Sequence, residues 1–202
     1  LLKALCDLKR FYPAQFQIVA ITVDMRFGKK DGDFSQIQRL CEECGIEYVV
    51  KPTDLYEIIF EVRKEENPCA LCARMRRGIL HDTAKELGCN KIALGHHLDD
   101  AAETFVMNLL LESRIGCFAP VTYLSRKDIT MIRPLIYVRE REAVAASERL
   151  ILPVVESGCP ANEKTKREDI KILLNGLCKQ YGDVPEKIIG AMQRAGIDRW
   201  EK

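Results

Sequence analysis

The residues with the clearest chemical potential form one short block of glycine, two histidines and two aspartates. The block is Gly95–Asp100 (Gly-His-His-Leu-Asp-Asp). It follows an apolar run over 90–94 that predicts a buried strand, and its last three residues begin a helix predicted over 98–112. Open α/β sheets bind ligands at such turns, and glycine lets the backbone come close to a ligand. Paired carboxylates there suit a Mg²⁺ ion that holds polyphosphate oxygens. The alternative is that Asp99 and Asp100 only cap the helix, because aspartate is common near helix starts.

A second block carries two cysteines three positions apart, at the start of another predicted helix. Cys69 and Cys72 lie in the sequence Pro-Cys-Ala-Leu-Cys, and Cys159 lies in a predicted loop. A helix N-terminus favours the thiolate form of cysteine, which is the form that binds metals. Zinc sites usually have four protein ligands, whereas three thiolates suit an iron–sulfur cluster with one iron left open. We therefore predict that Cys69, Cys72 and Cys159 bind a metal; the alternative for the first two is a pair of buried thiols.

Basic side chains follow both cysteine sites. Arg74 and Arg77 come directly after the cysteine pair, and Lys166 and Arg167 follow Cys159. Arginine can hold phosphate or an RNA backbone through bidentate hydrogen bonds, so Arg74 and Arg77 are predicted to contact nucleic acid. The alternative is an ordinary solvated helix face.

The elements that must position these residues alternate between strand and helix over residues 1–112, which are about half of the chain. This alternation predicts an α/β fold with a doubly wound parallel sheet. The predicted strands are 16–25, 46–50 and 90–94, and the predicted helices are 1–10, 34–44, 54–63, 70–87 and 98–112.

The rest of the chain has a different pattern. Two short apolar pieces, 121–123 and 130–132, predict a small hairpin. The pieces that follow are a helix over 139–150, a short extended segment over 151–155, and helices over 162–178 and 184–195. We predict an α/β domain over 1–155 and a C-terminal helical extension over 156–202.

Composition limits the classes of function. The 202 residues carry a net charge of +1, so nucleic-acid binding must come from local patches rather than from global charge. No apolar run approaches the roughly 20 residues that span a bilayer, which predicts no membrane partner. Nine cysteines without a secretion signal indicate the cytoplasm, where disulfides are disfavoured and clustered cysteines indicate metal or redox chemistry.

The block that runs from Gly95 to Thr104 resembles the second signature of the N-type ATP pyrophosphatases, the PP-loop proteins that modify tRNA. With the cysteines included, the resemblance covers nearly the whole chain and is closest to the tRNA 2-thiocytidine synthetases. It implies an adenine nucleotide alpha hydrolase-like fold, with ATP, Mg²⁺ and a 4Fe–4S cluster on three cysteines as cofactors. It also implies tRNA as a partner, a cysteine desulfurase or sulfide as sulfur donor, and a homodimer.

The resemblance further implies a reaction and a role for each residue. ATP would adenylate the C2 carbonyl oxygen of a pyrimidine in tRNA, and a sulfur atom held on the open iron would displace AMP. Asp100 and Asp99 would be the catalytic residues that hold Mg²⁺ and pyrophosphate, and the metal would neutralise developing charge. Gly95, His96 and Asp100 would contact the nucleotide, and Asp24 would lie beside the adenosine.

The sequence departs from this family pattern in two places. Members carry a Ser-Gly-Gly-x-Asp-Ser loop before the first helix, whereas this sequence opens directly on the helix. We therefore expect the central first strand and the phosphate loop to be missing from this chain, and hydrolysis of ATP by the family mechanism is not expected without them. Bacterial members often have a second Cys-x-x-Cys where this chain has Glu156 and Cys159.

Two other hypotheses stay open. A lysidine synthetase-like ligase fits the histidine–aspartate block equally well, although lysine transfer needs no cluster. A non-catalytic remnant that binds zinc or RNA is the third.

Overall fold

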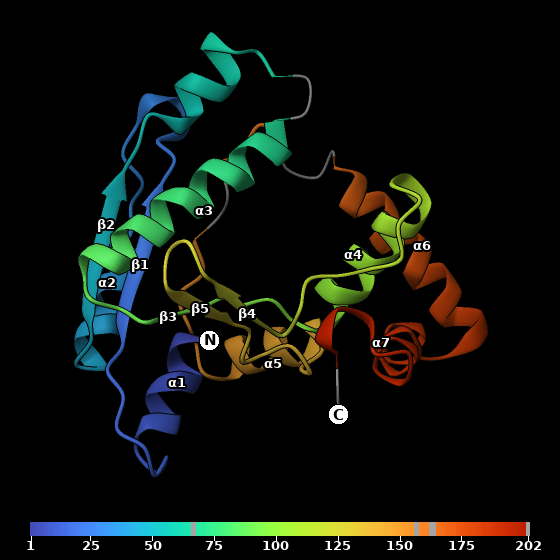
Figure 1. Cartoon of the computed structure of the whole chain (residues 1–202). Coiled ribbons are helices and arrows are strands. Elements are labelled where there is room, and N and C mark those ends of the chain that lie inside the picture. Colours follow the sequence, from blue (N-terminus) through green and yellow to red (C-terminus); the bar gives the residue numbers. More distant parts are fainter. Residues whose placement is uncertain (66–67, 156–157, 162–164, 201–202) are drawn as a thin grey trace. The chain divides into compact units, whose positions relative to one another are not determined.

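The computed structural model describes residues 1–65, 68–155, 158–161 and 165–200 (Figure 1). Its helices and strands group into two compact units. They are Leu1–Asn90 with Ile151–Asn162, and Lys91–Leu150 with Glu163–Lys202.

The first unit is built on a parallel pair of strands. β1 (Val19–Asp24) and β2 (Glu47–Pro52) run side by side with Ile21 opposite Val49. One helix packs against β1 and another against β2, which are α3 and α2 respectively (Figure 1). The helices of this unit are α1 (Leu2–Lys9), α2 (Ser35–Glu43) and α3 (Pro68–Glu86).

A small apolar core holds α3 in the first unit. Leu55 and Ile59 are buried, and Leu71, Met75 and Ile79 of α3 pack against them. These three α3 residues are four positions apart, so they share one face of the helix. That face fixes the rotation of α3, and with it the position of the cysteines at its start.

The second unit is built on a three-stranded sheet in the order β3-β5-β4. β3 (Lys91–Ala93) is parallel to β5 (Ile129–Ile132), and β4 (Val121–Leu124) forms an antiparallel hairpin with β5. The backbone N–H of Leu94 donates to the carbonyl oxygen of Ile132 at 2.9 Å. The segments that follow β3 and β5 therefore leave the sheet at the same edge.

Helices pack around α4 in this unit. α4 (Leu98–Leu111) contacts α6 (Lys166–Tyr181) and α7 (Val184–Arg194), and α5 spans Glu140–Arg149. Trp200 is fully buried in the core beneath α4, where its indole N–H donates to a backbone carbonyl oxygen at 3.0 Å.

The α/β architecture with parallel strands confirms the predicted fold class. The segment predicted as a helix over 54–63 contains a π-helical stretch, Glu57–Val62. The predicted hairpin exists, but it is not separate from the sheet, because β5 pairs with β3. Helix α3 begins two residues earlier than predicted, so Cys69 and Cys72 both lie within it.

Two organisational predictions are not tested by these elements. Within the described residues, β1 and β3 each pair along one edge, and the missing first strand and phosphate loop stay a prediction. The predicted domain boundary between 155 and 156 also stays a prediction, since residues 156 and 157 lie outside the described residues. In the part of the chain that is described, every helix is too short or too polar to span a membrane.

Candidate functional site

The block Gly95–Asp100 forms the turn from β3 into α4, and Asp100 has one oxygen committed to the helix start. His97 is the N-cap: its Nδ1 accepts a hydrogen bond from the Asp100 backbone N–H, with 3.3 Å between the nitrogens. In return the His97 backbone N–H donates to Oδ2 of Asp100 at 2.9 Å, which completes a reciprocal capping box. The other oxygen, Oδ1, lies 3.7 Å from Nη1 of Arg167. Asp100 therefore caps the helix and still presents a carboxylate oxygen.

Asp99 has a different environment, because both of its oxygens are held. Nε and Nη2 of Arg139 donate to the Asp99 carboxylate at 2.8–3.1 Å, and the Glu140 backbone N–H donates to Oδ2 at 2.6 Å. Arg139 also donates to Asp183, the N-cap of α7. Burial raises the pKa of Asp99. The hydrogen bonds from Arg139 and Glu140 lower this pKa and together outweigh burial, so the net shift is downward. Asp99 thus ties α4 to the starts of α5 and α7.

Arg167 of α6 donates hydrogen bonds to the first turns of α4. Its Nη1 donates to Oε2 of Glu103 at 3.0 Å and to the Asp100 carbonyl oxygen at 3.4 Å, and its Nη2 donates to Oγ1 of Thr104 at 3.1 Å. Burial raises the pKa of Glu103, and Arg167 only partly offsets this effect. The sequence showed Arg167 only as a basic residue that follows Cys159, and in the structure these donors are engaged with α4.

Gly95 and His96 precede the helix start. A side chain built on Gly95 would meet no atom within 4 Å, so the turn has open space at that point. The His96 ring stacks on Phe118, with 4.9 Å between the ring centroids. Burial lowers the pKa of His96, and the charge of Asp100 only partly offsets this effect. Neutral imidazole is therefore the favoured form of His96 in the folded protein.

Sequence reasoning missed one residue that lies beside this turn, Arg133. It follows β5, and its guanidinium carbon lies 4.6 Å from the centroid of the Phe118 ring. The residue is 7% exposed. An arginine directly after an apolar strand was the available signal, but nothing local shows that this strand neighbours β3.

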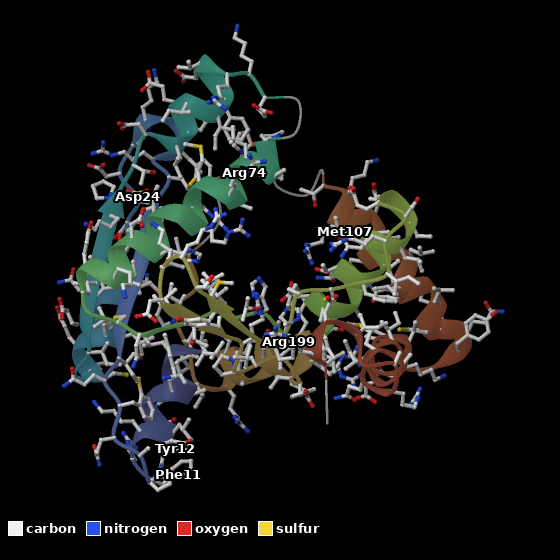
Figure 2. The ribbon with its side chains drawn as sticks, in the orientation of Figure 1. Phe11, Tyr12, Asp24, Arg74, Met107 and Arg199 are labelled. Carbon is white, nitrogen blue, oxygen red and sulfur yellow. The ribbon has the colours of Figure 1, made fainter. Side chains whose placement is uncertain are left out.

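Asp24 lies at the end of β1, as predicted (Figure 2). Its two carboxylate oxygens accept hydrogen bonds from the backbone N–H groups of Arg26 and Gly32, at 2.9 and 3.0 Å. Its carbonyl oxygen accepts from the backbone and hydroxyl of Thr53. The carboxylate therefore shapes the loop after β1, and its contact with adenosine stays a prediction.

The predicted metal ligands all belong to the first unit, and none of these three cysteines is in a disulfide. Cys69 is exposed, and Cys72 is half-buried four residues before Arg76. Burial raises the pKa of Cys72, the charge of Arg76 lowers it, and the charges of Cys159 and Cys69 raise it again, with a net upward shift. Cys69 and Cys159 are thus both close enough to Cys72 to act on it electrostatically. A bound metal overcomes a raised thiol pKa, because a coordinating thiol is deprotonated outright.

The loop that carries Cys159 contacts the core beside α3. A side chain built on Gly158 would lie 3.2 Å from Cβ of Phe27, and Phe27 packs in the same cluster as Cys72. Among the described residues, no three metal-binding side chains are arranged to hold an ion, and Glu156 lies outside those residues. The donor set still fits an iron–sulfur cluster in its chemistry, since three cysteines come from one unit.

Arg74 and Arg77 are exposed on α3, in the turns that follow the cysteines (Figure 2 labels Arg74). Within the part of the chain that is described, neither forms an ion pair with a carboxylate. They are available to a phosphate backbone, and their contact with nucleic acid stays a prediction.

Comparison with known proteins identifies the family of this chain. The PP-loop domain family matches residues 1–172. The chain belongs to this family. A tRNA-cytidine(32) 2-sulfurtransferase of Geobacter sulfurreducens is 36% identical over 195 residues, which cover 95% of this chain and 75% of that protein. The enzyme of the same name from Dechloromonas aromatica is 33% identical, over 96% of this chain and 67% of that protein.

A solved structure agrees with these relatives. It is the U34-tRNA thiolase NcsA from Methanococcus maripaludis with its 4Fe–4S cluster, with a TM-score of 0.75 and 25% identity. The match covers 96% of this chain and 66% of that chain. The family and the fold inferred from the histidine–aspartate block and the cysteines are both confirmed.

Proposed function

We propose that this PP-loop protein is an ATP-dependent tRNA sulfurtransferase that makes 2-thiocytidine. ATP adenylates the C2 oxygen of a cytidine in tRNA and releases pyrophosphate, and sulfide-level sulfur then displaces that oxygen, which leaves as part of AMP. The single observation that carries the proposal is that three cysteines outside any disulfide, Cys69, Cys72 and Cys159, lie in one unit of the PP-loop fold. The relatives named as 2-sulfurtransferases support the same substrate class.

The three cysteines would hold the 4Fe–4S cluster. When bound through three thiolates, such a cluster supplies an iron that is open to a sulfur atom. Cys72 is anchored by its packing against the buried cluster that includes Leu55 and Ile59, whereas Cys69 is exposed. This difference leaves one side of the ligand set accessible to solvent.

The turn before α4 would receive the nucleotide. Oδ1 of Asp100 is the carboxylate oxygen that would hold Mg²⁺, because Oδ2 caps the helix. Gly95 leaves room for a close approach, and neutral His96 can act as a hydrogen-bond partner without adding charge. Asp99 supports this arrangement through Arg139 rather than through free oxygens of its own.

Mass spectrometry of tRNA nucleosides tests the substrate. Cells that carry the gene are expected to contain 2-thiocytidine, and cells from which the gene is deleted are expected to lose it. Restoring the gene with Asp100→Asn should not restore the nucleoside. An unchanged 2-thiocytidine level after deletion would refute the proposal.

Metal analysis of protein prepared without oxygen tests the cluster. Brown protein with iron and sulfide is expected, and Cys69→Ser, Cys72→Ser and Cys159→Ser should each lower the iron content. Cys89→Ser is the matched control, because Cys89 lies in the same unit and is not a predicted ligand. A colourless, iron-free protein would favour the lysidine ligase, and zinc in place of iron would favour the binding remnant.

The proposed reaction also needs a cellular location, a sulfur donor and a surface that contacts tRNA. We place it in the cytoplasm, where thiols stay reduced, with a cysteine desulfurase or free sulfide as sulfur donor. Arg74 and Arg77 would contact the tRNA backbone. Sedimentation of the purified protein tests the proposed homodimer.

A further inference from the structure

Arg133 has an unusual environment for a charged side chain. It is 7% exposed, its Nη1 donates to the carbonyl oxygen of Ala119, and its Nε has no hydrogen-bond partner among the described residues. Ion pairs within that part of the chain do not include it. Burial lowers the pKa of Arg133, although an arginine stays protonated in proteins. A buried cation without a carboxylate destabilises the fold, so a packing role alone does not account for it.

The neighbours of Arg133 are the residues of the candidate nucleotide turn. Arg133 directly follows β5 and His96 follows β3, and these two strands are parallel neighbours. Their carboxyl ends lie at the same sheet edge, which is where open α/β sheets bind ligands. Both Arg133 and His96 contact the ring of Phe118.

His96 adds a second unused polar atom at this place. Its Nδ1 is buried and has no hydrogen-bond partner within the described residues. The groups whose charges act on His96 are Asp100, Arg133, Arg167 and His97. Arg167 is committed to Glu103 and Thr104, so Arg133 is the cation of this group that lacks a carboxylate among the described residues.

We propose that Arg133 binds a phosphate group of ATP in the turn before α4, beside His96 and Gly95. This inference rests on the proposed function and adds a phosphate-binding residue to it. A phosphate oxygen would accept a hydrogen bond from Nε and would supply the negative charge that the buried guanidinium lacks. The same chemistry occurs in an RNA backbone, but a guanidinium that is 7% exposed suits a small ligand that enters the turn. The N-terminus of α4 favours negative charge at the same place.

Calorimetric titration of the full chain with MgATP tests this role. Arg133→Met keeps an apolar stem over Phe118 and removes the charge. It should weaken MgATP binding by about tenfold or more, as expected for a charge-assisted hydrogen bond. Adenosine binding should change little, and the unfolding temperature should be unchanged or raised because an uncompensated buried charge is removed. Arg133→Lys keeps the charge without the planar fork and should lie between Arg133→Met and the unaltered protein.

Arg126→Met is the matched control, since Arg126 is an exposed arginine of the same hairpin. It should bind MgATP as the unaltered protein does. A lower unfolding temperature for Arg133→Met with unchanged MgATP affinity would show a structural arginine and overturn the inference. So would a loss of binding to an anticodon stem–loop RNA with MgATP binding intact, or an unaltered chain that binds no MgATP.

The two proposals fail separately. If Arg133→Met loses MgATP while gene deletion leaves 2-thiocytidine unchanged, the phosphate site stands and the thiolation proposal falls. If deletion removes 2-thiocytidine while Arg133→Met binds MgATP normally, thiolation stands and the phosphate site falls.

Discussion

Replacing Arg139 with methionine should unfold the second unit at much lower denaturant concentration. The Asp99 and Arg139 side chains are 16% and 11% exposed, and they share a bidentate ion pair. Among the described residues, Arg139→Met would leave the buried Asp99 carboxylate with the Glu140 N–H as its one hydrogen-bond donor, and it would also release Asp183. Removing one partner of a buried ion pair typically costs about 3–5 kcal/mol, so we expect a loss of that size in the free energy of unfolding.

Urea unfolding followed by the fluorescence of Trp200 measures this loss. Trp200 is the sole tryptophan and is fully buried in the second unit, so its signal reports on that unit. Asp99→Asn combined with Arg139→Met should cost less than the sum of the two single changes, with a coupling of about 1–3 kcal/mol. Arg141→Met is the matched control: Arg141 is 73% exposed, lies 3.8 Å from Asp183 and should contribute under about 0.5 kcal/mol.

Acidification gives an independent check on the same pair. The pKa of Asp99 is lower in the folded protein than its ordinary value of 3.8. Its contribution to stability is therefore present above that ordinary value and is lost as the pH falls through the lowered one. Arg139→Met should reduce this acid sensitivity. A cost for Arg139→Met no larger than that of Arg141→Met, with no coupling to Asp99, would refute the reasoning.

Three further outcomes follow from the same geometry. Asp100→Asn keeps an oxygen that can accept the N-cap hydrogen bond, so the unfolding temperature should stay unchanged. The MgATP affinity measured by titration calorimetry should fall about tenfold or more. An affinity equal to that of the unaltered protein would show that Asp100 is not part of the metal site. Cys117 is buried, and burial raises its pKa to about 12, so iodoacetamide near about pH 8 should modify exposed Cys69 and leave Cys117 intact, as peptide mass spectrometry would reveal. The pKa of His96 is lowered by burial from 6.5, so stability should fall as the pH drops below about 6.5, and His96→Phe should reduce that fall in urea titrations; an identical pH dependence would contradict a buried neutral imidazole.

The local elements were predictable because local chemistry decides them. Gly45 and Gly88 follow predicted helices and have φ values of +63° and +71°, a conformation that glycine adopts at little cost. Apolar periodicity likewise predicted α2, α4 and the hairpin strands with ends within two residues of those observed. The pairing of the hairpin with β3 was not predictable, because parallel partners are joined by long connections with no local signal.

Residue type and spacing alone determined the family of this protein, the block Gly95–Asp100 and the thiols Cys69, Cys72 and Cys159. Only the tertiary structure separated the roles of the two adjacent aspartates, since Asp99 meets Arg139 from 40 residues away and Asp100 keeps one oxygen free of the helix cap. It also brought Arg133 beside His96. The physical reason is that helix and turn preferences act over a few residues, whereas ion pairing and burial depend on segments that meet only when the chain folds.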